Sequence, residues 1–199
     1  MENEVIGTVQ SGAMFDLGEC LSQVQASKKW FAQRILPLSL EQLRWRPRRE
    51  KWSVCQCLAH LNLGLELWLP SLDSAIAGRS THSRILPGQH RIDSREIKAL
   101  KVVEPPVVIP SLAMPALIPP AAVDADHLVN YFYRLRDRYA SVIRSALHLD
   151  VGTIRLAEPI APPIRSLGAT IAYLAAHERR HIWQVEQLFK TPAFPRGPS

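Results

Sequence analysis

Two histidines near the end of the chain have the spacing of metal ligands. His177 and His181 lie four residues apart in an alanine-rich, apolar stretch from 167 to 189. Residues four apart on an α-helix project from the same face, one turn above the other. Two imidazole rings in this arrangement can reach one divalent cation, so the stretch is a candidate metal site. Glu178, directly after the first histidine, can serve as a general base or as the hydrogen-bond partner of a ligand.

The segment from His177 to His181 also spells H-E-x-x-H, the motif of zinc metalloproteases. A catalytic zinc needs three protein ligands and an open position, and in those proteases the third ligand comes from further downstream. Only 18 residues follow His181, they are rich in proline, and no strand is evident among them. We therefore do not favour a peptidase, and we expect the third ligand on another helix.

Helical geometry predicts which side chains of this stretch face the interior. With successive residues placed at 100° intervals, His177 and His181 fall on the flank of an apolar face and Glu178 near its middle. Arg179 and Arg180 are predicted to point away from that face. An unpaired carboxylate inside a protein is costly, so Glu178 is expected to have a partner. The apolar face consists of Leu167, Ile171, Leu174, Ile182, Val185, Leu188 and Phe189.

His60 is the candidate for the third metal ligand. It is the one remaining histidine well inside a predicted helix, and Gly64, one turn further on, would leave room for an ion. A single histidine at the border of an apolar face is usually structural, but its pairing with His177 and His181 favours a ligand. The other histidines lie in a predicted irregular region (His82, His90) or near the ends of a later helix (His127, His148).

Two further side chains could contribute to this site. Gln184, three residues after His181, is predicted on the same flank as the histidines, either as the partner of a ligand or of a substrate, or as an ordinary surface glutamine. Cys57, close to His60, could compete as a soft ligand, although a buried structural thiol is the favoured interpretation.

Four amphipathic helices are predicted to position these residues. Ser53 and Gln56 form a capping box at the start of the second, and Ser166 can cap the last. Pro70 is expected to kink the second helix or to end it early. Six prolines between 103 and 120 predict extended chain, which we expect to lie across the surface and cover the mouth of a pocket. The predicted helices cover approximately 12–36, 52–77, 121–146 and 166–190.

These helices predict an all-α fold, a four-helix bundle with a long Pro-rich crossover between its second and third helices. The domain is expected to span 12–190, with a loose N-terminus at 1–11 and a loose C-terminal tail at 191–199. The chain of 199 residues is long enough for one domain with a full core, and we see no internal repeat.

Composition indicates a water-soluble protein. Apolar residues make up 47% of the chain and charged residues 21%, and no apolar run is long enough to span a bilayer. No secretory signal is evident at the N-terminus, and the three cysteines (Cys20, Cys55 and Cys57) are expected to be free thiols. We therefore expect a cytoplasmic location and no contact with a membrane.

The net charge of +6 raises the question of nucleic acid binding. The arginines are scattered, no known nucleic-acid module is evident, and the densest basic cluster lies in a predicted loop. We interpret that cluster as a solvated loop and expect no nucleic-acid partner, although its field would also attract anionic small molecules. The cluster consists of Arg44, Arg46, Arg48, Arg49 and Lys51.

Two segments resemble those of the DinB-like family of metal-dependent four-helix bundles. They are Trp52-Ser-Val-Cys-Gln-Cys-Leu-Ala-His60-Leu61 and His177-Glu-Arg-Arg-His181-Ile-Trp-Gln184. The resemblance covers approximately residues 12–190, and the Pro-rich insert looks longer than is usual in the family. It implies a metal triad with one histidine from the second helix and two from the last. These correspond to His60, His177 and His181.

The resemblance also implies what such a site does. Members look like transferases and hydrolases that activate a thiol or water on a divalent ion, with zinc or nickel expected from three imidazoles. A low-molecular-weight thiol such as bacillithiol, mycothiol or glutathione is often the co-substrate, and homodimers are common. We therefore expect a small-molecule substrate and a homodimer. The alternative is a non-catalytic metal-binding protein with a stress or interaction role, because a fold does not determine a substrate.

Overall fold

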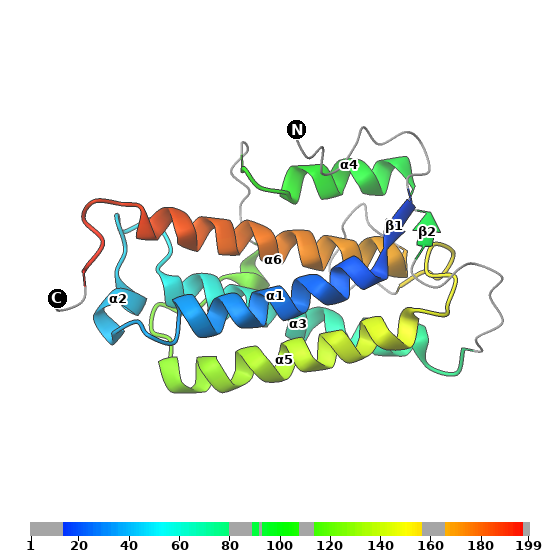
Figure 1. The fold of residues 1–199 in the computed structure, drawn as a ribbon, viewed down its shortest axis with the longest axis horizontal. Helices are drawn as coiled ribbons and strands as arrows, with labels where there is room; N and C mark the ends of the chain where they lie inside the picture. Colours follow the sequence, from blue (N-terminus) through cyan, green and yellow to red (C-terminus); the bar gives the residue numbers. More distant parts are fainter. Residues whose placement is uncertain (1–13, 80–88, 92, 108–113, 157–165, 197–199) are drawn as a thin grey trace.

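Four long helices form the body of the molecule (Figure 1). The computed structural model describes residues 14–79, 89–91, 93–107, 114–156 and 166–196. Within these residues α1 and α3 each pack against both α5 and α6, so that α5 and α6 lie diagonally opposite each other. The prediction of an all-α fold is confirmed. The four helices are α1 (Leu17–Arg34), α3 (Val54–Ile76), α5 (Ala125–Ala146) and α6 (Leu167–Phe189).

Local sequence signals account for the ends of these helices. Ser53 and Gln56 form the predicted capping box at the start of α3, and the Ser166 hydroxyl accepts a hydrogen bond from the backbone N–H of Ala169 at the start of α6. The first helix starts at Leu17 and not near residue 12, because Asp16 caps it. Pro70 does not end α3 early, since the helix continues to Ile76.

Five shorter elements complete the described chain. Strands β1 (Met14–Asp16) and β2 (Gln89–Arg91) form a small antiparallel sheet, with Met14 opposite Arg91. Helix α2 (Leu40–Arg44) includes Arg44, which was predicted in the basic loop, and the other residues of the basic cluster follow it. All of them are exposed, as predicted. Helix α4 (Ser94–Val103) lies on the outside of α6 (Figure 1), and the 3₁₀-helix η1 spans Pro115–Leu117.

Helix α4 and the two strands correct the sequence-based prediction. The sequence predicts an irregular region from Gly78 to the third long helix, and it predicts no strand. Asp93 and Glu96 form a capping box that starts α4. Of the Pro-rich segment 103–120, residues 108–113 lie outside the described part, and Pro115–Leu117 form η1.

The four-helix bundle has two large apolar clusters separated by a polar layer, and a third, small cluster lies between α4 and α6. One cluster gathers the first half of α1 and α6 with the second half of α3 and α5, around Leu69, Tyr139 and Ile171. The other gathers the opposite halves, around Phe31 and Leu58. Buried polar side chains lie along the four helices at the level between them. They are Ser27 on α1, His60 and Asn62 on α3, Arg136 on α5, and Glu178 and His181 on α6.

No helix in the described ranges is long and apolar enough to cross a membrane. The three cysteines are buried and unpaired, as predicted. Burial raises the pKa of the Cys57 thiol to about 12, so that it stays protonated at neutral pH. Cys57 is therefore a poor ligand in this structure, in agreement with the structural role favoured from the sequence.

Candidate metal centre

Both ring nitrogens of His60 have a partner. His60 lies in the first third of α3, and only 3% of its surface is exposed. Its Nδ1 atom is 2.6 Å from the backbone carbonyl oxygen of Leu117 in η1. A carbonyl can only accept a hydrogen bond, so Nδ1 carries the proton and Nε2 presents a lone pair. That lone pair faces the two histidines of α6.

The three histidines converge through their Nε2 atoms. His177 Nε2 lies 3.1 Å from His60 Nε2 and 3.1 Å from His181 Nε2. On the other side of its ring, His181 Nδ1 is 3.0 Å from Gln184 Oε1. The amide oxygen accepts the Nδ1 proton, which leaves the Nε2 lone pair of His181 directed at the centre as well. The structure thus brings together the three predicted ligands from two helices.

This arrangement fits a divalent ion better than it fits hydrogen bonds alone. His177 Nε2 can donate one proton, yet it faces two unprotonated nitrogens at the same distance. A tetrahedral ion with metal–nitrogen bonds of about 2.0–2.1 Å separates its ligands by about 3.3–3.4 Å, close to the spacing observed. A Cβ on Gly64 would meet no described heavy atom within 4 Å, so there is open space one turn from His60.

The electrostatic environment keeps the three imidazoles neutral. Burial lowers the pKa of His177 to about 3, with further lowering from His60, Arg180 and Arg136. Burial also lowers the pKa of His60, and it lowers that of His181 well below its ordinary value. Neutral imidazole is the form that binds metal, so the site is ready for an ion at neutral pH.

Two aromatic rings enclose the histidines. The Trp52 ring lies 4.8 Å from the His60 ring and 6.0 Å from the His181 ring, measured between centroids. Tyr173 stacks on His177 with the two planes 8° apart and the centroids 5.9 Å apart. Both rings are only half-buried, so they form the walls of the site toward the surface. Such packing restricts the rotation of the imidazoles.

Glu178 is buried but directed at an arginine. Its Oε1 accepts a hydrogen bond of 2.7 Å from Arg136 Nε on α5. Nη1 of Arg136 donates to Asn62 Oδ1 on α3 at 2.5 Å. The group of described residues that could hold an ion contains the three histidines and not this glutamate. The partner expected for a buried Glu178 is therefore an arginine of another helix.

Arg180 points away from the apolar face of α6, toward α4, and is buried there. It is 8% exposed, and its Nη1 donates a hydrogen bond of 3.3 Å to the carbonyl oxygen of Val102. Its neighbour Arg179 is partly exposed and forms an ion pair with Glu104. Val102 and Glu104 belong to the end of α4, which covers this side of α6 and was not foreseen. The positive charge of Arg180 acts on all three histidines.

Other residues of the site were also missed in the sequence. Arg136 is the clearest case, since it lies four residues after Phe132 and three before Tyr139, on the face predicted to be buried. A charged residue at such a position is a signal that could have been read. Leu117 contributes through its backbone carbonyl, for which no sequence signal exists.

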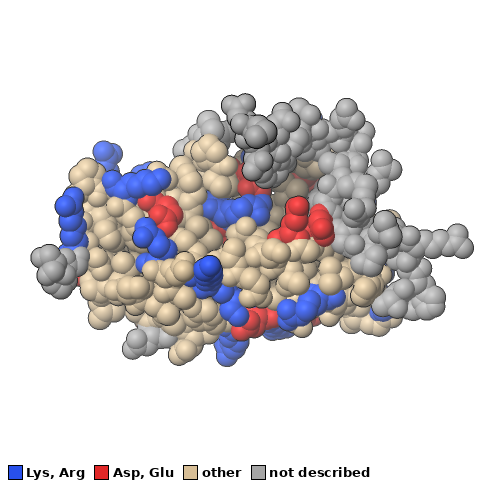
Figure 2. All heavy atoms as spheres, in the orientation of Figure 1, with Lys and Arg blue, Asp and Glu red and all other residues tan. Residues whose placement is uncertain are grey.

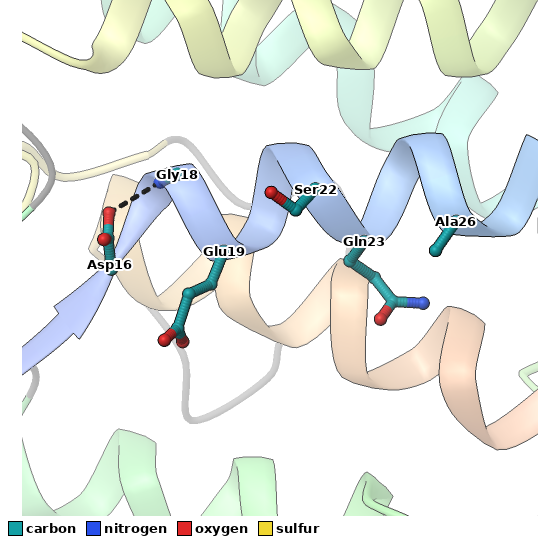
Figure 3. Close-up of a pocket in the computed structure, with 6 residues that line it drawn as sticks. All are labelled: Asp16, Gly18, Glu19, Ser22, Gln23 and Ala26. Carbon is teal, nitrogen blue, oxygen red and sulfur yellow. Dashed lines mark hydrogen bonds between the residues drawn. The ribbon is translucent and has the colours of Figure 1, made fainter.

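One surface hollow lined by described residues lies away from the histidines. It follows the outer side of α1 and has a volume of about 550 Å³ (Figure 3). None of the predicted site residues lines it. The face in Figure 2 shows acidic side chains interspersed among the basic ones, with no continuous basic patch. The lining residues are Asp16, Gly18, Glu19, Ser22, Gln23 and Ala26.

Comparison with known families gives one match. The sequence model of the DinB superfamily matches residues 23–185, which include the three histidines and all four long helices in whole or in part. No curated protein and no solved structure gives a significant match. The match supports the resemblance seen in the two histidine-bearing segments.

Proposed function

The chain belongs to the DinB superfamily, and we propose that it binds one divalent metal ion through His60, His177 and His181. The observation that carries this proposal is the convergence of three neutral imidazoles, with His177 Nε2 at 3.1 Å from both of the others. Three imidazole ligands suit zinc or nickel, and we propose one of these as the native ion.

We further propose a transferase or hydrolase reaction on a small molecule, with a low-molecular-weight thiol as co-substrate of the transferase. An ion held by three imidazoles keeps one position open, and it lowers the pKa of a water or thiol there. The protein contributes the orientation of its ligands, through Leu117 for His60 and Gln184 for His181. Arg180 adds a positive charge close by, which would favour an anionic thiol or substrate.

A second candidate is metal binding without catalysis, in a stress or interaction role. The burial of His60 and His181 favours it, because a substrate needs access to the ion. Both candidates share the metal site.

Elemental analysis of the purified protein tests the shared metal site. We expect about one equivalent of zinc or nickel per chain, and loss of that metal in the His60→Ala variant. His148→Ala is the matched control, because His148 is exposed and lies in the turn after α5. Wild-type protein that holds no stoichiometric metal, even after incubation with zinc or nickel, would overturn the proposal.

Turnover separates the two candidates. Metal-loaded protein is incubated with a panel of thiols and a generic electrophile, and product is compared with that of the His177→Ala variant. Thiol consumption above the variant supports the transferase. A test ester is used in the same way for the hydrolase. If wild type and His177→Ala consume every thiol at the same rate and hydrolyse the ester at the same rate, the non-catalytic alternative is supported. Light scattering on the same samples tests the homodimer that we propose from the family.

A further inference from the structure

Arg136 connects the two helices that carry the histidines. It is fully buried on α5, with no exposed surface. Its guanidinium bonds Glu178 on α6 at 2.7 Å and Asn62 on α3 at 2.5 Å. A guanidinium can serve two acceptors at once because its donors form a fixed, planar fork. One side chain therefore sets the distance between a point on α6 and a point on α3.

Both partners of Arg136 are close in sequence to a histidine of the site. Glu178 directly follows His177, and Asn62 comes two residues after His60. Helices α5 and α6 lie diagonally opposite, so the Arg136–Glu178 pair crosses the core at the level of the polar layer. A shift of α6 relative to α3 that opened the histidine cluster would also break this link.

The chemistry of the link is unusual for a contribution to stability alone. Removing two charges from water costs more than their attraction often returns, and an apolar replacement of similar size can be as stable. Arg136 also lies over the Phe132 ring, 3.6 Å from its centroid, which holds the guanidinium in place. The ion pair has a high desolvation cost, is rigidly held, and lies beside three converging histidines. A role in fixing the positions of those histidines explains it better than a contribution to stability does.

We propose that Arg136 is a positioning residue of the metal centre, which fixes the spacing of His60 relative to His177 and His181 by binding Asn62 and Glu178. This inference rests on the proposed metal binding. It also assigns Glu178 a role: the carboxylate holds α6 to Arg136 and is not the general base.

The test uses a double variant, Arg136→Met with Glu178→Leu, which removes both charges together and leaves no buried ion unpaired. We expect the metal dissociation constant to rise about 10-fold to 100-fold, as for other partners of metal ligands. We also expect the visible absorption spectrum of the cobalt-loaded protein to change, since it reports ligand geometry. Urea unfolding of the metal-free proteins is measured in parallel.

Two further variants keep the result interpretable. Arg138→Met removes an exposed ion pair with Asp73 that also joins α5 to α3, and it should leave affinity and spectrum unchanged. Arg136→Lys keeps the charge but has no fork, so its affinity should fall between wild type and the double variant. It decides the question if the double variant does not fold.

Wild-type affinity and a wild-type cobalt spectrum in the variants would overturn the positioning role. The same holds if Arg138→Met weakens binding as much as the changes at Arg136. Absence of metal from the wild type itself would overturn the proposed function. The two failures are therefore distinguishable.

Discussion

The hydrogen bonds on the outer side of the imidazoles decide what the centre can bind. His60 donates Nδ1–H to the Leu117 carbonyl and His181 donates Nδ1–H to Gln184, which leaves both Nε2 atoms as acceptors. Both bonds are made by Nδ1, not by the Nε2 atom that would bind the metal. Each bond nevertheless fixes the tautomer and the orientation of its ring. Such partners also raise the basicity of the ligand nitrogen.

Replacing Gln184 tests this orientation effect. Gln184→Ala leaves the Nδ1–H of His181 without its acceptor, so the metal dissociation constant should rise about 10-fold. Gln184→Glu keeps an acceptor and should bind metal at least as tightly as wild type. Isothermal titration with zinc measures both, and Gln187→Ala, on the next turn of α6, is the control. Equal affinity in the Ala and Glu variants would contradict the effect.

The lowered histidine pKa values predict how the metal-free protein responds to pH. Burial lowers the pKa of His177 to about 3, whereas it titrates near 6.5 in the unfolded chain. Between these values the unfolded state binds more protons, so folding stability falls as the pH drops below about 6.5. Each such histidine contributes about 1.4 kcal/mol per pH unit.

Urea unfolding of the metal-free protein between about pH 6.5 and about pH 5 measures this slope. The His177→Gln variant should lose less free energy of unfolding per pH unit than wild type, by about 1.4 kcal/mol. His148→Gln, at an exposed position, should keep the wild-type slope. If the free energy of unfolding fell with the same slope in wild type and His177→Gln, His177 would not be held neutral by the fold.

At the scale of elements, α4 acts as an external support of α6. Glu96 on α4 is buried, and its carboxylate accepts hydrogen bonds from the backbone N–H and the hydroxyl of Ser166, at 2.8 and 3.0 Å. Ser166 in turn caps α6. At the other end of α4, Glu104 pairs with Arg179. Helix α4 is thus attached to α6 at its start and again near the histidines.

Removal of the Glu96 carboxylate should destabilise this attachment. Glu96→Ala leaves buried donors of Ser166 unpaired, so the free energy of unfolding should fall by about 1–3 kcal/mol. Hydrogen exchange should increase in α4 and in the first turn of α6. Glu41→Ala, an exposed acid in the first turn of α2, should change stability by less than about 0.5 kcal/mol. A similar loss in both variants would exclude a specific role for Glu96.

Features that depend on residues close together in the sequence could be predicted, and features that depend on contacts between distant segments could not. Ser53 with Gln56 and Ser166 were predicted correctly, because capping depends on residues three positions apart. The convergence of His60 with His177 and His181 followed from spacing together with a family resemblance. Helix α4 was missed although Asp93 and Glu96 form the same kind of capping box, since nearby prolines suggested extended chain. The burial of Arg180 depends on α4, so it could not be predicted without that helix.

At the scale of the molecule, the metal centre lies in a polar layer between two apolar clusters. In this layer, in the middle of the bundle, His60, His181 and an Arg136–Glu178 pair are buried in place of apolar side chains. Without an ion, converging lone pairs and neutral imidazoles contribute little to stability. An ion that joins α3 to α6 would stabilise the fold at this layer.

Metal should therefore raise the thermal stability of the whole domain. An ion at 1,000 times its dissociation constant adds about 4 kcal/mol if only the folded state binds it. For a chain of this size that is an increase in Tm of about 10 °C. Differential scanning calorimetry with added zinc, and after removal of metal with a chelator, measures the change.

Variants separate this effect from general metal binding. His60→Ala and His181→Ala should show the same Tm with and without metal, because two histidines hold the ion too weakly to shift the equilibrium. His127→Ala, at an exposed histidine of α5, should keep the full increase. If His60→Ala were stabilised as much as wild type, the ion would bind elsewhere, and the junction of α3 and α6 would not be its site. If the increase in Tm is lost only in variants of the three converging histidines, the ion stabilises the fold from the junction of α3 and α6.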